Sequence, residues 1–534
     1  MNKTKLVLTA AFIFSCTISM AQTRTVSGKI TSSEDSKPIP EVSVRLKGAI
    51  ASTVSDAKGG YSIAIDEKST EVLIFSHPDF DDMEIGVNGK NQLDIQLTSN
   101  VRYNQYGVRV NRTPLDAEER NGILVFESKD QSHRIWYDVR VQADGAMFFG
   151  DTYNEIGNGT SIRRARFAVK TEFANNWYAE FDMDIANSEL ELKDAYLQYQ
   201  NNGLEVRVGN FKEVYSMEST TTSRYLTFLE RPMAVNTFAP SRHIGFGINY
   251  NREWLFTSGG IHFQAVDDLE ERTFSKDHNK DGGIDEGYSL TGKLVIMPWF
   301  SDVNKGLHIG IAGSYRTPRT DAEVWDYATQ RGSIRYSTRS LSSINRKKYI
   351  DTDDITNVEY STLGGMELAG YFKGFRLQSE YLMSSVTRFD DMGTEKFNGF
   401  YIFGSMMLFG GNYQYNTSEG EFTQPKRGKS WGDIELALRY DYLNLNSLTE
   451  GSSLMGGAGE GYTLGLNYYV NNNIKIMLNY AYLNHDRYAN GKNKLFVGYD
   501  ANGELTKNPK LVVDETGKAG EDFHMITIRF EVDF

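Results

Sequence analysis

The chain has 534 residues, 13% of them aromatic, and a formal net charge of −13. This acidic balance argues against a nucleic-acid partner, because binding to phosphate backbones needs clustered lysine and arginine. After the N-terminus no run of about 18 apolar residues occurs, so a helical membrane anchor is not expected. The mean hydropathy of −0.46, with 49 glycines and 10 prolines, is typical of strands that have one apolar and one polar face.

The first 21 residues have the pattern of a secretory signal peptide. Lys3 and Lys5 precede an apolar run at 6–18, and Ala21 ends a cleavage site of small residues. The alternative is a lipoprotein signal that uses Cys16, the only cysteine. If cleavage follows Ala21, the mature protein has no cysteine and therefore no disulfide framework.

Residues 22–98 are predicted to form a small β-sandwich. Five short runs have the period of strands, at 26–30, 42–46, 60–65, 72–75 and 93–97. Turn-forming residues separate them, at 38–40 and at 56–59. Residues 99–133 form a polar connection. This spacing of strands favours a separate domain in front of the rest of the chain.

One turn of this region carries a resemblance. Residues Asp56-Ala57-Lys58-Gly59-Gly60-Tyr61 form a slightly stretched version of the Asp-x-x-Gly-x-Phe turn of the carboxypeptidase regulatory-like domain. That domain has a transthyretin-like fold and often precedes outer-membrane proteins of Bacteroidetes type. The resemblance implies a docking or spacer role toward a periplasmic or membrane protein, and no peptidase activity.

Residues 134–534 alternate between strand-like segments and two kinds of junction. Short junctions lie at 174–176, 200–203, 251–252, 372–374 and 471–473. Long polar junctions lie near 212–241, 267–287, 317–356 and 485–521. Short turns on one side and long loops on the other are the layout of an outer-membrane β-barrel. One junction, 410–431, is long where a short turn is expected.

We predict sixteen antiparallel transmembrane strands in this all-β chain. They lie near 134–149, 161–173, 177–187, 190–200, 204–211, 242–250, 254–266, 288–298, 306–316, 357–371, 375–388, 397–409, 432–446, 461–470, 474–484 and 522–534. Alternation supports them: in the second segment Phe167 and Val169 share one face, and Arg166 and Lys170 share the other. The glycine-rich run 456–461 is predicted to be a loop tip.

Several stretches of this region resemble the phosphate-selective porin O and P family. They are Arg163–Arg166, Lys193–Tyr196, Val208–Glu213, Tyr225–Pro232, Gly465–Tyr469 and Met477–Tyr480. The resemblance covers about 122–534. It implies a sixteen-stranded barrel in outer-membrane lipid, a homotrimer, and a third loop that folds inward to narrow the channel. That loop would be 212–241.

Lumen-facing lysine and arginine attract anions, whereas rings of aspartate and glutamate attract cations. The residues expected to line the pore and to bind small anions such as phosphate are Arg164, Arg166, Lys170, Arg207, Arg224, Arg231 and Arg242. The alternative is that these side chains only pair with nearby carboxylates and stiffen the lumen. No strand carries a long ladder of alternating arginines. A general pore for small anions or mixed solutes therefore remains open beside a phosphate-specific one.

A second binding signal lies in the loop near 267–287. Asp277, Asn279, Asp281 and Asp285 occupy positions 1, 3, 5 and 9 of a calcium-loop pattern, with glycine at the sharp turn. Position 12 is Tyr288 instead of the bidentate glutamate. The alternative is an ordinary acidic surface loop. Apart from this possible Ca²⁺, no cofactor is expected.

Other functional classes are less consistent with the sequence. It has no His-Glu-x-x-His, no Gly-x-Ser-x-Gly and no complete phosphate-binding loop. A hydrolase whose serine, histidine and acid meet only in the fold stays an alternative. A receptor barrel of about 22 strands with a plug would leave about 18 residues for each strand, against about 25 for sixteen strands. We therefore expect a non-enzymatic, weakly anion-selective outer-membrane porin whose N-terminal domain lies in the periplasm.

Overall fold

A computed structural model describes residues 23–66, 71–110, 113–120, 122–266, 284–299, 302–322, 329–330, 332–344, 347–389, 392–449, 452–514 and 518–534. The chain divides into two compact units, Met1–Pro114 and Leu115–Phe534, and each is described by itself. Of the described helices, none is long and apolar enough to cross a membrane.

The first unit is a β-sandwich, as predicted. One sheet has the order β4-β1-β7 and the other β3-β2-β5-β6. Their bounds are β1 Thr23–Ser32, β2 Ser43–Leu46, β3 Ser52–Val54, β4 Gly60–Asp66, β5 Val72–His77, β6 Phe80–Gly86 and β7 Ile95–Leu97. A short hairpin of β8 (Arg102–Tyr103) and β9 (Arg109–Val110) follows.

Both sheets of this unit contribute to one apolar core. Val26 and Ile63 come from the first sheet, and Val44 and Phe75 from the second. The turn before β4 is closed by Asp56, whose Oδ1 accepts hydrogen bonds from the backbone N–H groups of Lys58 and Gly60. These two bonds lower the pKa of the Asp56 carboxyl.

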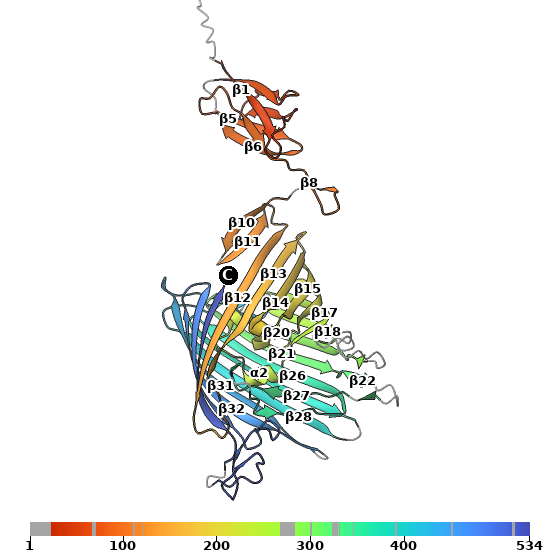
Figure 1. Cartoon of the computed structure of the whole chain (residues 1–534), viewed down its shortest axis with the longest axis vertical. Coiled ribbons are helices and arrows are strands. Elements are labelled where there is room, and N and C mark those ends of the chain that lie inside the picture. Colours follow the sequence, from red (N-terminus) through yellow and green to blue (C-terminus); the bar gives the residue numbers. More distant parts are fainter. Residues whose placement is uncertain are drawn as a thin grey trace, which may run out of the picture. The chain divides into compact units, whose positions relative to one another are not determined.

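The second unit is a closed antiparallel barrel of sixteen strands (Figure 1), which confirms the predicted number. The strands are β12 Arg134–Phe149, β13 Gly159–Phe173, β14 Trp177–Asp184, β15 Glu191–Asn201, β16 Leu204–Lys212, β17 Arg242–Arg252, β18 Leu255–His262, β20 Ser289–Ile296, β21 Lys305–Arg316, β26 Val358–Phe372, β27 Phe375–Arg388, β28 Thr394–Met407, β31 Asp433–Thr449, β32 Ser452–Tyr469, β33 Ile474–His485 and β36 Asp522–Asp533. Pairing of β12 with β36, from Arg140↔Asp533 to Phe149↔His524, closes the ring.

The two faces of the barrel wall differ as the alternation predicts. Tyr137, Phe167, Phe181 and Phe530 are exposed on the outer face, which is the face that lipid would cover. Their neighbours in sequence, Asp138, Arg166, Asp182 and Arg529, turn inward and are buried or half-buried. Period-two geometry alone produces this sorting, because successive side chains point to opposite faces of a strand.

Residues 115–128 are more ordered than the polar connection we expected. They form the hairpin of β10 (Leu115–Arg120) and β11 (Ile123–Ser128), and β11 pairs with the start of β12. The hairpin thereby adds two strands to the barrel sheet without entering the closed ring.

The glycine-rich run 456–461 is not a loop tip, so that prediction was wrong. It lies inside β32. A Cβ on Gly457 would lie 2.6 Å from the Cα of Ala489, so glycine is needed where the loop after β33 packs on the strand. Close backbone approach, and not a turn, explains these residues.

Short elements occupy the junctions of the barrel. The strands are β19 Ile284–Asp285, β22 Thr320–Ala322, β23 Thr329–Gln330, β24 Ser337–Thr338, β25 Ile350–Asp351, β29 Tyr415–Asn416, β30 Glu421–Phe422, β34 Gly498–Tyr499 and β35 Leu505–Thr506. The helical turns are η1 Ala186–Ser188, α1 Met217–Thr220, η2 Ser223–Tyr225 and α2 Met233–Phe238. Three of these turns belong to the loop between β16 and β17, called the inner loop below (residues 213–241).

Candidate functional site: a charged passage through the barrel

The inner loop folds into the lumen, as the family resemblance implied. Its backbone is bonded to side chains of strands far along the chain: Met217 N–H donates to Glu367, Met233 N–H to Asp441, and the Leu229 carbonyl accepts from Arg529. These partners lie on β26, β31 and β36. The loop therefore crosses the lumen and is fastened to the opposite wall.

Apolar packing fills the space behind the inner loop. Phe228, Met233 and Phe238 share one core with Leu382 and Phe397 of the barrel wall. This core closes the lumen on the side of β26–β28. The open space is left between the inner loop and the wall formed by β12–β18.

The junction 408–432, which is longer than the short turn expected there, also folds inward. Its β29–β30 hairpin is held by Tyr413, whose hydroxyl donates to Glu435 at 2.7 Å, and by Tyr415, whose hydroxyl lies 2.5 Å from His308 Nδ1. The Arg376 guanidinium lies 3.8 Å from the centre of the Phe422 ring. We call this element the inner hairpin (residues 413–423).

A cavity of about 560 Å³ lies between the inner loop, the inner hairpin and the β12–β18 wall. All seven cationic residues predicted from the sequence line it. Arg140 and Lys212 join them, and the acidic lining residues are Asp138, Glu172, Glu180, Asp182, Asp194, Glu205, Glu419 and Glu421. The lining is thus mixed in sign and close to balanced in charge.

Many of these charges are paired, as the alternative interpretation expects. Lys170 Nζ lies 3.5 Å from Glu180, Arg166 lies 3.3 Å from Asp182, and Arg242 lies 2.6 Å from Asp194. Arg224 pairs with Asp138 and lies 3.1 Å from Asp533. Arg207 donates to the Gln198 amide oxygen at 2.7 Å and lies 4.0 Å from Glu205.

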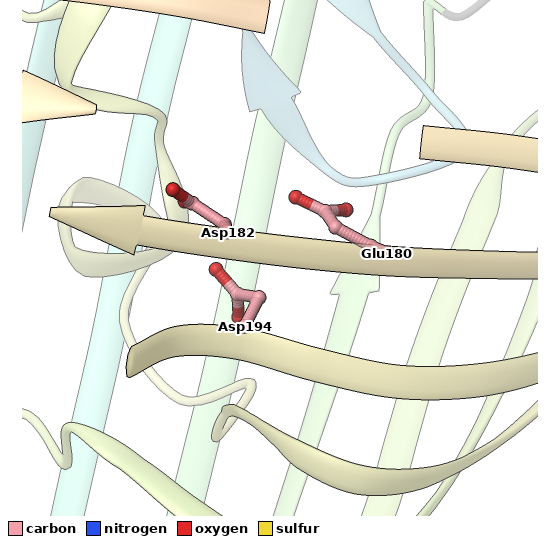
Figure 2. Close-up of side chains that lie close together, drawn as sticks. All are labelled: Glu180, Asp182 and Asp194. Atoms are coloured by element: carbon pink, nitrogen blue, oxygen red, sulfur yellow. The ribbon is translucent and has the colours of Figure 1, made fainter. Parts of the chain in front are cut away.

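The three carboxylates Glu180, Asp182 and Asp194 lie together on the wall (Figure 2), with ligand atoms within 4.8 Å of one another. Such a spacing could suit a metal ion. Each carboxylate, however, already has its own cation, namely Lys170, Arg166 and Arg242 in turn. The three carboxylates therefore fix cationic side chains at the passage, and their negative charge is already balanced by those side chains.

A second cavity, of about 320 Å³, continues from the first. Five residues line both cavities and mark where they meet: Arg164, Arg166, Lys212, Arg231 and Arg242. All five are cationic, and we call them the cationic junction. A solute that passes between the cavities must therefore pass positive charge.

Three members of the cationic junction have no carboxylate within ion-pair distance among the described residues. Arg164 donates to the Gln142 amide oxygen at 2.7 Å, and Lys212 donates to the Ser219 carbonyl. Arg231 donates to the carbonyls of Glu218 and Thr221 at 2.7 and 2.6 Å. Burial lowers the pKa of Arg231 to about 10, which still leaves its guanidinium charged at neutral pH. These contacts orient the three side chains without pairing them with a carboxylate.

Sequence reasoning missed Lys212 and Arg140 for different reasons. Alternation from Arg207 places Lys212 on the outer face, but the chain turns into the lumen there at the start of the inner loop. Arg140 shares the inner face with Asp138 and Gln142, so the same alternation could have identified it.

Most of the predicted calcium loop falls outside the part of the chain that the structure describes. Asp277, Asn279 and Asp281 lie outside the described residues, and only the backbone of Asp285 is described, in β19. Ca²⁺ binding there remains a prediction.

A serine–histidine pair bears on the hydrolase alternative. Ser340 Oγ lies 2.9 Å from His485 Nε2, and Nδ1 of the same ring lies 2.6 Å from the Glu521 carbonyl. Ser340 is 0% exposed and His485 1%. Neither residue lines either cavity of the passage, so this pair offers a substrate no access and stabilises the packing of the loops.

Comparison with known proteins finds a matching family for each of the two parts of the chain. Residues 133–501 match the family described as phosphate-selective porin O and P, and residues 26–108 match the CarboxypepD_reg-like domain. Porin O of Pseudomonas aeruginosa is 22% identical over 396 residues, which cover 69% of this chain and 87% of that protein. TonB-dependent receptor P3 of Formosa agariphila is 36% identical over 77 residues, 14% of this chain and 8% of the receptor.

Among solved structures, the anion-selective porin from Comamonas acidovorans matches with a TM-score of 0.44 and 12% identity, over 75% of this chain and 100% of that one.

Proposed function

Since this chain belongs to the phosphate-selective porin O and P family, we propose that its pore prefers small anions weakly over cations and admits phosphate among them. The chain is an outer-membrane porin.

One observation carries the proposal: the residues common to both cavities are all cationic, and three of them have no carboxylate partner among the described residues. An anion at this point can replace part of its hydration by bonds from guanidinium and ammonium groups. A cation meets three positive side chains there that have no carboxylate partner among the described residues, beside two that are paired with aspartates.

The preference should be weak because carboxylates line the same passage. Arg166 and Arg242 are each tied to an aspartate, Asp182 and Asp194. Glu419 of the inner hairpin also lines the first cavity, and Glu421 beside it adds a negative charge only as the pH rises through about 8, where its pKa lies because of burial. A phosphate ion therefore meets a net positive junction inside an otherwise balanced lumen.

Planar-bilayer recording in a KCl gradient tests the proposal. The reversal potential of the wild-type pore should indicate anion preference, and phosphate titration should reduce the chloride current. Arg164→Gln combined with Arg166→Gln should move the reversal potential toward that of a cation-preferring pore. Arg252→Gln, which removes an exposed arginine outside both cavities, is the matched control. A wild-type pore that already prefers K⁺ would overturn the proposal and point to Glu180, Asp182 and Asp184 as the filter.

The same proposal includes the arrangement in the cell. We propose a homotrimer in the outer membrane, with the carboxypeptidase regulatory-like domain in the periplasm, where it serves as a spacer or docks on a protein partner. The pore would act by diffusion and not by catalysis. Crosslinking in intact outer membranes, followed by mass analysis, tests the trimer.

A further inference from the structure

The first cavity contains a feature that selection of a small inorganic anion does not require. Three aromatic rings lie side by side on its wall: the centre of the Trp136 ring is 6.0 Å from that of Tyr178, which is 5.8 Å from that of Tyr196. All three line the cavity and are partly exposed to it. The inner faces of pores are normally polar, so an inward row of aromatic side chains calls for a separate cause.

The direction of these rings follows from their positions in the strands. Trp136 and Tyr178 point inward, whereas Tyr137 and Trp177 beside them are exposed on the outer face. The inward rings therefore do not belong to the aromatic residues that contact lipid.

Hydrogen bonds hold two of the rings in place and leave other polar groups available. The hydroxyls of Tyr178 and Tyr196 both donate to Glu180 Oε2, at 2.6 and 2.9 Å. Among the described residues, no partner accepts from the Trp136 indole N–H or bonds the Tyr225 hydroxyl, and both residues line this cavity. The Arg207 guanidinium lies 4.4 Å from the centre of the Tyr196 ring, and the Arg134 guanidinium lies 5.9 Å from that of Trp136. A solute can thus find ring surface, neighbouring cations and unused hydrogen-bonding groups here.

The distance to the cationic junction indicates the size of the solute. Trp136 pairs across the sheet with Lys170, which lies four residues along β13 from Arg166. Four residues of strand span about 13 Å, and the long arginine side chain reduces the gap. A bare phosphate ion cannot contact both places, whereas a phosphate ester with a ring at its other end can.

We propose that the passage binds phosphate monoesters of ring-bearing compounds, with the ring against Trp136, Tyr178 and Tyr196 and the phosphate toward the cationic junction. This inference rests on the proposed anion preference and extends it to a class of solute. Sugar phosphates and nucleoside monophosphates share this chemistry.

Single-channel recording of the full-length protein tests the inference. The probes are inorganic phosphate, glucose 6-phosphate and AMP, with uncharged glucose and adenosine as references. At least one ester should interrupt the current for about fivefold longer than inorganic phosphate, the size expected for one stacked ring. If only AMP interrupts the current for longer, the three aromatic rings bind nucleobases. If only glucose 6-phosphate does so, they bind sugars.

Variants separate stacking from charge. Trp136→Leu with Tyr178→Leu should bring the ester interruptions down to those of inorganic phosphate, while the reversal potential in KCl stays unchanged. Tyr178→Phe keeps the ring and should keep most of the effect. Tyr137→Leu with Trp177→Leu, on the outer face, is the matched control.

Two results would overturn the inference. If both esters and inorganic phosphate interrupt the current of an anion-preferring pore for equal times, the aromatic site is disproved and the proposed anion preference stands. If the wild-type pore prefers cations, the aromatic site and the anion preference are both disproved.

Discussion

The cationic side chains in the lumen differ in whether they form an ion pair with a carboxylate. Arg242 is tied to Asp194 by two bonds, at 3.0 and 2.6 Å, whereas Arg231 donates only to backbone carbonyls. A paired arginine is oriented but largely neutralised, and an arginine on carbonyls keeps its full charge. Counting arginines is therefore a poor guide to selectivity, and counting unpaired ones is a better guide.

Releasing a paired arginine should strengthen anion preference. Asp194→Asn removes the carboxylate from Arg242 and adds one net positive charge at the cationic junction. A unit charge about 8 Å from the ion path contributes about 0.5 kcal/mol in water, so anion occupancy should rise about twofold. Reversal potentials at low salt measure this. Asp79→Asn, in the first unit, is a charge-matched control, and an unchanged potential in Asp194→Asn would contradict the interpretation.

Glu421 should make selectivity depend on pH. Burial, followed by repulsion from Glu419, raises the pKa of Glu421 to about 8. The carboxyl is therefore neutral below that pH and becomes an anion as the pH rises through it. The nearby charges are Glu419 of the same hairpin, Lys212, Lys293 and Arg231.

We expect anion preference to fall between about pH 7 and 9 in the wild-type pore, because the new negative charge opposes the cationic junction. Glu421→Gln should flatten this change, and Glu504→Gln, in an exposed loop, should not. The reversal potential of the wild-type pore and of both variants, measured across this pH range, tests the expectation. A wild-type pore with the same selectivity at pH 7 and 9 would argue against the role of Glu421.

At the scale of elements, two segments from opposite ends of the strands occupy the lumen. The inner loop follows β16 and the inner hairpin follows β28. The hairpin is closed at its base by the bridge between Asn412 and Lys426. It can therefore be removed at that bridge while the sequence of every barrel strand is kept, and the removal takes away the partners of Glu435, His308 and Arg376.

Replacing residues 413–425 by a two-residue Asn-Gly turn should widen the passage. Single-channel conductance should rise, and the pH dependence should disappear with Glu419 and Glu421. Shortening the β34–β35 hairpin, which lies in the loop after β33, controls for the loss of residues. Unchanged conductance would show that the inner hairpin does not narrow the pore.

The last strand ends on an exposed aromatic side chain. Phe534 is 55% exposed on the outer face, and its backbone N–H donates to the Val139 carbonyl across the closing pair β36–β12. Deleting Phe534 removes this ring and a bond of the closure. We expect less heat-modifiable barrel in outer membranes, measured by gel shift. Phe534→Tyr should restore the yield, and full yield after the deletion would count against the prediction.

At the scale of the whole molecule, the two units have separate cores. The first unit packs around residues such as Val26 and Phe75, and the barrel needs none of its residues to close its ring. Removing residues 23–114 behind the intact signal segment should therefore leave assembly and conductance unchanged. Loss of the heat-modifiable form in that deletion, with the point variant Val26→Ala assembling normally, would show that the barrel depends on the first unit.

Much of this architecture is encoded locally. The strands β12 and β27 have the bounds that alternation predicts, 134–149 and 375–388. Inner and outer faces sort correctly because a side-chain period of two depends only on the strand itself. The seven predicted cations share one cavity for the same reason: each sits on an inward position or in the loop that folds inside.

Other features depend on contacts between distant residues, and sequence alone could not supply them. Arg529 bonds the Leu229 carbonyl 300 positions away, and this bond helps to place the inner loop against the far wall. The inward turn at Lys212, the inner hairpin and the glycines of β32 follow from such packing. The sequence by itself determined the number of strands and their inner and outer faces, because alternation is a property of short segments, and its resemblance to the porin family indicated the class of pore. Tertiary structure alone decided which cations lie at the passage and which remain unpaired, because an ion pair exists only where the closed barrel brings its two partners together.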